Sequence, residues 1–130
     1  MISKSSLLLL AALVAACGGS IEPAPITPAG TYRLTIVDSS ALPAARTTGD
    51  SVLSGGAVLY ENGAYIINWF SPSYYFGTRD IIVTTDSGQW GVNGSQLQFA
   101  SITGANWNGK FNPPSMSIHL RTSDWTFVKQ

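Results

Sequence analysis

The chain is mostly a succession of short apolar runs separated by turn residues, and this pattern limits the folds that it can adopt. Beyond residue 30 the apolar side chains alternate or cluster in runs rich in Val, Ile, Thr, Tyr, Phe and Trp. No run has helical spacing, so the period of two predicts β-strands. The predicted strands cover residues 31–37, 51–60, 64–70, 78–86, 88–93, 95–101, 105–111, 115–121 and 125–129.

The segments between these strands are rich in turn-forming residues. Asn-Gly at residues 93–94 is a tight hairpin signal, and Gly, Pro, Asn, Asp and Ser gather at residues 61–63, 86–88, 112–114 and 122–124. Short loops make consecutive strands antiparallel neighbours. The sequence therefore predicts an all-β fold, an antiparallel up-and-down small β-barrel of about eight or nine strands, whose closure removes exposed edges.

One long connection, residues 38–50, interrupts this rhythm. It has two interpretations: a lid over one mouth of the barrel, or a surface crossover in which Leu42 and Pro43 lie against the barrel end. We expect the crossover, because nothing else in the segment indicates a lid.

The first residues predict export and lipidation. Lys4 precedes an apolar stretch, residues 7–16, that is too short to span a bilayer and is typical of a signal peptide. It ends in Val-Ala-Ala-Cys, which looks like a lipobox, so residues 1–16 are the predicted signal peptide and Cys17 the lipid attachment site. Palmitate-type acyl chains on Cys17 would anchor the protein to a membrane. The alternative is an ordinary secretory signal followed by a chance cysteine.

Downstream of Cys17, residues 17–29 contain three prolines and no periodic apolar face, and are predicted to be a tether. Residues 30–130 form the predicted barrel domain. By resemblance to enterobacterial sorting, Gly18 in place of an acidic residue implies no retention at the inner membrane. The expected location is the cell envelope, and the outer membrane in a Gram-negative host.

Several stretches carry a family resemblance, namely residues 30–34, 54–59, 62–65 and 87–99. They look like those of small lipocalin-like bacterial lipoproteins, a group that mostly has no assigned function. Gly30-Thr31-Tyr32 is also similar to the Gly-x-Trp opening of lipocalins, where the aromatic closes the barrel floor under an arginine from the last strands. The resemblance implies a lipocalin-like barrel with Tyr32 and Arg121 as the barrel-closing pair.

Composition and motifs leave little room for other chemistry. After loss of Lys4, six basic and seven acidic residues remain, a net charge near −1 that argues against a nucleic-acid partner. His119, the only histidine, shares the polar face of its strand with Ser117 and Arg121 and has no nucleophile motif beside it. One histidine, one cysteine and scattered carboxylates predict no metal site. We therefore expect neither an enzyme nor a cofactor.

The densest feature is aromatic: Trp69, Phe70, Tyr74, Tyr75 and Phe76 lie within eight residues around a proline. The proline predicts a turn or bulge, and one face cannot hold all five rings, which favours an exposed ligand or partner surface. The alternative is that the rings plug one barrel end. The expected function is a membrane-anchored envelope lipoprotein that binds a small apolar ligand. The alternative, favoured by a filled interior, is a protein-interaction or structural module, such as a protease-inhibitor-like barrel.

Overall fold

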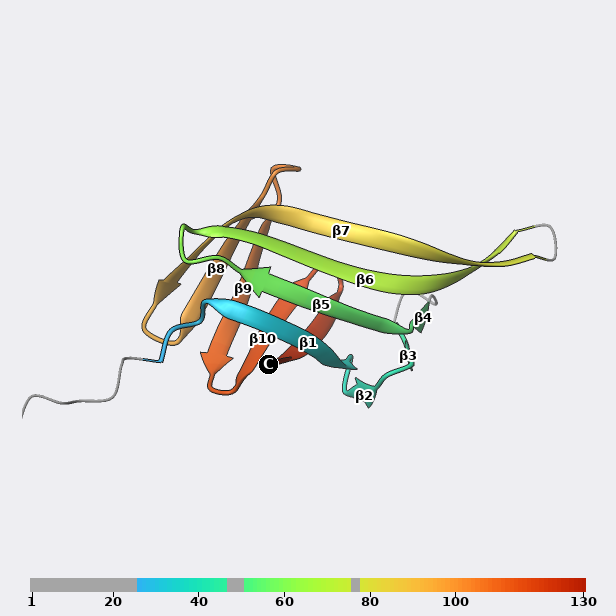
Figure 1. The fold of residues 1–130 in the computed structure, drawn as a ribbon, viewed down its shortest axis with the longest axis horizontal. Coiled ribbons are helices and arrows are strands. Elements are labelled where there is room, and N and C mark those ends of the chain that lie inside the picture. Colours follow the sequence, from blue (N-terminus) through green and yellow to red (C-terminus); the bar gives the residue numbers. More distant parts are fainter. Residues whose placement is uncertain (1–25, 47–50, 76–77) are drawn as a thin grey trace, which may run out of the picture.

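The computed structural model describes residues 26–46, 51–75 and 78–130, and these are all-β. Each barrel strand pairs antiparallel with the next along the chain, and β11 pairs with β1 to close the barrel (Figure 1). The predicted up-and-down barrel is confirmed. The eight barrel strands are β1 (Gly30–Val37), β5 (Ser54–Leu59), β6 (Ala64–Tyr75), β7 (Thr78–Asn93), β8 (Gln96–Ser101), β9 (Asn106–Asn112), β10 (Ser115–Leu120) and β11 (Ser123–Lys129).

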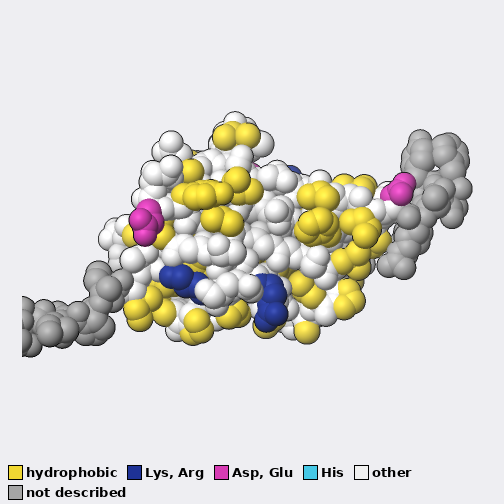
Figure 2. Space-filling model, in the orientation of Figure 1, with side chains coloured by type: hydrophobic (Ala, Val, Ile, Leu, Met, Phe, Trp, Pro, Cys, Tyr) yellow, Lys and Arg dark blue, Asp and Glu magenta, His cyan; other side chains and the backbone are white. Residues whose placement is uncertain are grey.

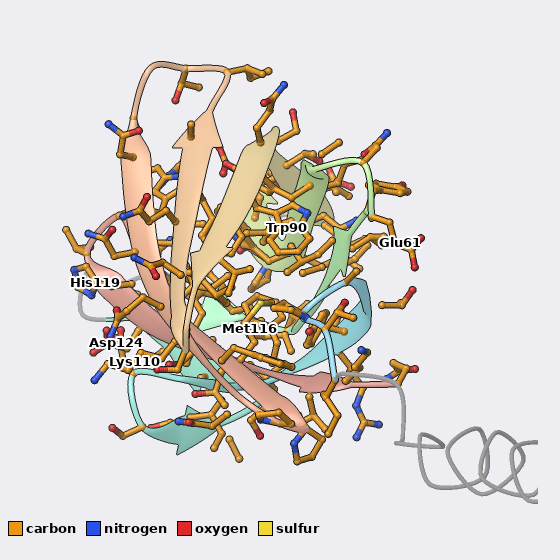
Figure 3. All side chains as sticks on the ribbon, turned by 90° about the vertical axis from the view of Figure 1, so that its left-hand side faces the viewer. Glu61, Trp90, Lys110, Met116, His119 and Asp124 are labelled. Carbon is orange, nitrogen blue, oxygen red and sulfur yellow. The ribbon has the colours of Figure 1, made fainter. Side chains whose placement is uncertain are left out.

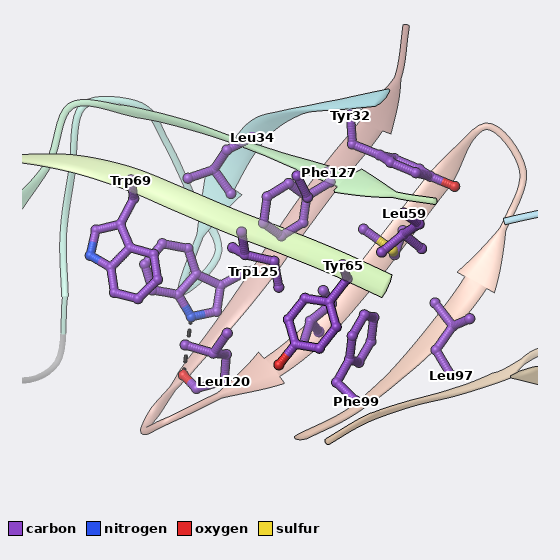
Figure 4. Packing of buried hydrophobic residues seen from close by; sticks show 14 of the residues in the cluster. Tyr32, Leu34, Leu59, Tyr65, Trp69, Leu97, Phe99, Leu120, Trp125 and Phe127 are labelled. Atoms are coloured by element: carbon purple, nitrogen blue, oxygen red, sulfur yellow. Dashed lines mark hydrogen bonds between the residues drawn. The ribbon is translucent and has the colours of Figure 1, made fainter. Parts of the chain in front are cut away.

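Alternate side chains of these strands point inward and fill the barrel (Figure 4). Tyr65 meets Phe99 edge to face, with ring centroids 5.0 Å apart, and Trp69 meets Trp125 at 4.9 Å. Burial of these large rings is the main stabilising contribution in a barrel without a disulfide among its described residues. The largest fully buried side chains are Trp69, Trp125, Tyr32, Tyr65, Phe99, Phe127, Leu59, Ile67, Leu97, Met116, Ile118 and Leu120.

The long connection after β1 contains three short strands: β2 (Ser40–Ala41), β3 (Ala44–Ala45) and β4 (Ser51–Val52). β2 extends the sheet beside the end of β1, while β3 and β4 pair with each other. Leu42 packs against the core, as the crossover interpretation expects. The residues between β3 and β4 at 47–50 lie outside the described part.

β6 and β7 are longer than predicted. β6 continues past Phe70 and β7 runs without a break through residues 86–88, so the predicted turn there is wrong. Gly88 is required by a close approach between strands, because a Cβ at this position would lie 1.9 Å from the backbone oxygen of Ala100. Pro72 likewise lies within β6, opposite Ile81, and forms neither a turn nor a bulge.

The N-terminal end of the described chain is attached to the barrel. The Tyr32 hydroxyl donates to the carbonyl of Pro28, and the Lys129 ammonium donates to the carbonyl of Thr27 at 2.9 Å. Burial raises the pKa of Tyr32 to about 12, so its hydroxyl stays a donor at neutral pH. The last residues of the predicted tether thus belong to the folded unit. The predicted signal peptide and Cys17 lie outside the described residues.

Candidate interaction site

The interior of the barrel is filled with side chains. A ligand-sized cavity would leave accessible surface on the residues around it, yet Val37, Met116 and Trp125 are at most 1% exposed. Figure 3 shows Met116 in the middle of the barrel, surrounded by other side chains. The described part of the barrel is therefore filled by its own side chains, as small barrels of about eight strands can be.

Three hollows can be described on the outer wall, all of them lined by residues in the described part of the chain. They measure about 490 Å³ over β7 to β9, 390 Å³ over β8 to β11, and 310 Å³ over β1, β5 and β6. Phe99 and Ile118 line the first two hollows although their side chains point inward and are 1% exposed. The floors are therefore backbone, and these hollows are shallow grooves between rows of outward-facing side chains.

The predicted barrel-closing pair is not formed. Tyr32 lies opposite Lys129, whereas Arg121 sits in the turn between β10 and β11, beyond the other end of β1. The two residues cannot meet because β11 runs antiparallel to β1, which places the turn before β11 far from the start of β1. Arg121 instead lies over Trp69, with its guanidinium carbon 5.4 Å from the ring centroid.

Trp69 therefore belongs to the closed end of the barrel. Its side chain is 2% exposed, so its place in the predicted exposed surface is wrong. Arg46 covers the neighbouring Trp125 in the same way, at 5.3 Å, and donates from Nε to the Ser123 hydroxyl at 3.2 Å. Two tryptophans under two guanidinium groups close this end, with cation–π attraction added to burial.

A buried polar cluster joins four strands near the middle of β7. Asp86 accepts hydrogen bonds from the Tyr65 hydroxyl at 2.7 Å, the Ser101 hydroxyl at 2.5 Å and the Trp107 indole at 3.0 Å. Burial, followed by the bond to Asp86 and its charge, raises the pKa of Tyr65. These donors occupy the carboxylate, so Asp86 acts as a structural cross-link and is poorly placed to be a general base.

His119 lies on the outer wall, as its strand pattern predicts. Its Nδ1 is 2.7 Å from an oxygen of Asp124, and the two side chains are 61% and 78% exposed. Lys110 lies on the same flank (Figure 3). Within the described ranges no group of three or more His, Cys, Asp or Glu is arranged to hold a metal ion, and no helix is long and apolar enough to cross a membrane.

The most distinctive part of the surface is the outer end of the β6–β7 hairpin. β5 pairs with β6 only as far as Ser54 opposite Phe70, and β8 pairs with β7 only from Gly88 onward. Residues 71–75 and 78–82 therefore extend past the barrel as a two-stranded ribbon, which Figure 1 shows reaching out on the right, while residues 83–86 have β6 on one side and no described strand on the other. We call residues 70–75 and 78–86 the hairpin ribbon.

The hairpin ribbon exposes apolar side chains on both faces. Ile81, Ile82 and Val83 are 61%, 50% and 54% exposed. The register places Ile81 opposite Pro72 and Val83 opposite Phe70 on one face, which we call the apolar face. Figure 2 shows hydrophobic side chains gathered over this end of the molecule.

The predicted aromatic surface coincides in part with this ribbon. Phe70 lies on the apolar face and is partly buried, while the side chains of Tyr74, Tyr75 and Phe76 lie outside the described part. Ile81, Ile82 and Val83 were not among the predicted surface residues, because a run of β-branched residues is typical of a buried strand. The sequence does contain a signal for a long hairpin: residues rich in β-branched and aromatic side chains continue on both sides of residues 76–77 for longer than a barrel strand needs.

These features define the chain as a closed, filled, eight-stranded antiparallel β-barrel that carries a projecting hairpin. No model of a known protein family matches the sequence, and no similar curated protein is found. The fold by itself does not assign a function, because small barrels of this kind serve many.

Proposed function

We propose that this chain is a lipid-anchored envelope protein, similar to lipocalin-like lipoproteins, that acts as a protein-interaction module. The observation that carries the proposal is the hairpin ribbon: three consecutive apolar residues, Ile81 to Val83, are half exposed or more, beyond a barrel whose interior is full. The binding surface is the ribbon, and the barrel is the scaffold that holds it.

The exposed apolar residues of the ribbon are neighbours in space. Single exposed apolar residues are common on protein surfaces, but neighbouring ones on two paired strands form a patch that water solvates poorly. Covering apolar surface stabilises a complex by about 25 cal/mol per Å² before the costs of association. Ile81 and Val83, packed beside Phe70 and Pro72, form such a patch.

A ligand carrier and an enzyme receive less support. A small apolar ligand inside the barrel would have to displace core side chains such as Met116 and Phe127, which are at most 1% exposed. The buried carboxylate of Asp86 already accepts three hydrogen bonds, and His119 is exposed beside Asp124. Interaction through the surface is the function that these residues favour.

Site-specific photo-crosslinking tests the proposal on the full chain in intact cells. A photoreactive phenylalanine analogue in place of Ile81 should give a discrete protein adduct on irradiation. The matched control is Val92, which is 48% exposed but lies at the other end of β7, opposite Leu97. Adducts from position 81 and none from 92 support an interaction site on the ribbon. No adduct from 81, or equal labelling from both positions, would reject it.

A further inference from the structure

The β7 edge of the hairpin ribbon has unpaired backbone groups among the described residues. In an antiparallel strand, the N–H and C=O of every second residue point to the same side. Ser87 directs its carbonyl away from β6, since it accepts from the Ile102 amide at 2.9 Å. Counting back in steps of two, the N–H and C=O groups of residues 85, 83, 81 and 79 point to that same side. Among the described residues no strand pairs with this edge.

Between residues 81 and 85 this edge lacks the usual protection against pairing, and charged residues, Arg79, Asp80 and Asp86, lie only at its ends. Natural edge strands are blocked by lysines, prolines, bulges or short length. The stretch 81–85 is Ile-Ile-Val-Thr-Thr, entirely β-branched and uncharged, with Asp80 and Asp86 at its ends. Pro72, the only proline in β6, has its nitrogen on the opposite edge of the ribbon, because Phe70 directs its carbonyl to the Leu53 amide there, at 2.8 Å. The β7 edge is therefore competent to accept another strand.

The free edge is symmetric about Ile82, since residues 79 and 81 precede it and residues 83 and 85 follow it. We propose that a second copy of this chain adds its own β7 antiparallel to this edge, with the two-fold axis at Ile82. The inference rests on the proposed function and names the partner. In this register Ile81 of one copy lies opposite Val83 of the other, and all four free residues of each copy are paired, giving roughly eight main-chain hydrogen bonds.

The positions of the aspartates favour this register over its neighbours. With the axis at Ile82, Asp80 of one copy faces Thr84 of the other. An axis at Val83 would place Asp80 opposite Asp86, and like charges directly opposite one another destabilise a sheet. An axis at Ile81 would place Thr85 beyond the first residue of β7 in the other copy, where it has no strand partner.

The same register joins the apolar faces. Ile81 and Val83 lie on one face of the ribbon, so pairing them across the axis makes one stripe out of the two apolar faces. The two Ile82 side chains meet at the axis on the other face, where each is 50% exposed in the single chain. Pairing therefore brings the exposed side chains of Ile81, Ile82 and Val83 of one copy into contact with those of the other.

Cysteine cross-linking tests the register on the full chain in membranes. The two Ile82 residues would form a non-hydrogen-bonded pair with Cα atoms about 4.5 Å apart, which suits a disulfide. Ile82→Cys should therefore give an oxidised dimer. The control Asp80→Cys should not, because the two copies of residue 80 would lie roughly 13 Å apart along the strands. Co-expressed Asp80→Cys and Thr84→Cys chains should cross-link with each other. The unsubstituted chain, which retains Cys17, sets the background.

A proline variant supplies an independent measurement. The Val83 N–H faces the free edge, so Val83→Pro removes a hydrogen bond between copies and none within the ribbon. In the Ile82→Cys background it should lower the cross-linked fraction about tenfold while the melting temperature stays unchanged. If Asp80→Cys and Ile82→Cys cross-link equally, or if Val83→Pro has no effect on cross-linking, the partner is not a second copy of this chain. If Ile82→Cys gives no dimer while position 81 still labels another protein, only this inference fails and the proposed function stands.

Discussion

Asp86 has a structural role, because its side chain links several strands of the barrel through hydrogen bonds. Its carboxylate receives donors from β6, β8 and β9 while its own backbone belongs to β7. The side chain is only 6% exposed, and a carboxylate in such a place is tolerated because its oxygens are hydrogen-bonded. The cluster marks the point at which β7 leaves β8 and continues into the hairpin ribbon.

Removing one donor from this cluster should destabilise the fold. Tyr65→Phe deletes the 2.7 Å bond to Asp86 and leaves a buried charge with fewer partners. We expect the free energy of unfolding to fall by about 1.5 to 3 kcal/mol, the range for hydrogen bonds to charged groups. Chemical denaturation measures it. Tyr60→Phe, at a side chain that is 43% exposed, is the control and should change stability by less than about 0.5 kcal/mol. Equal effects at both positions would contradict the structural role of Asp86.

At the scale of elements, the hairpin of β6 and β7 departs most from a plain barrel. β7 changes neighbours along its length: β6 pairs with it from Thr78 to Gln89, and β8 pairs with its other side only from Gly88 onward. The close approach at Gly88 lets the backbone of β8 reach β7 where their pairing begins.

Substitution at this glycine tests the close approach. Gly88→Ala places a Cβ 1.9 Å from the Ala100 oxygen, so β7 and β8 must separate, and we expect a loss of roughly 2 kcal/mol or more in unfolding free energy. Gly91→Ala on the same strand has no atom within 4 Å of its new Cβ and should be neutral or slightly stabilising. Urea titration of both variants gives the comparison. A Gly88→Ala variant as stable as Gly91→Ala would show that the strands do not approach so closely.

At the scale of the whole molecule, the chain enters the barrel at one end and the hairpin ribbon leaves at the other. Figure 1 places the residues before β1 on the left and the ribbon on the right. Thr27 and Pro28 are held to the barrel, so the direction of the entering chain is fixed relative to the strands.

The anchor itself has a direct test. Cys17→Ser removes the only cysteine of the chain and with it the proposed acylation site. We expect the variant to remain unprocessed or to leave the detergent phase, because residues 7–16 are too short to anchor the protein stably on their own. Detergent-phase partitioning and the mass of the product report this. A variant that partitions and is processed like the unsubstituted chain would mean that Cys17 is not lipidated.

The sequence by itself determined most of the strands, the turns between most of them and the closed up-and-down order. These features are local: alternation of period two sets each strand, and short loops at residues such as 93–94 and 112–114 leave only the adjacent antiparallel position for the next strand. The inward positions of Leu97, Phe99 and Ile118 follow from the same alternation.

Only the tertiary structure decided the features that depend on distant segments. Arg121 covers Trp69 and not Tyr32 because pairing of β11 with β1 sets which barrel end each residue occupies. Whether Ile81 to Val83 are buried depends on where β5 and β8 stop, which lies in other parts of the chain. The sequence of this apolar run is typical of a buried strand, yet its side chains are exposed in the fold, because burial depends on which other segments lie beside them.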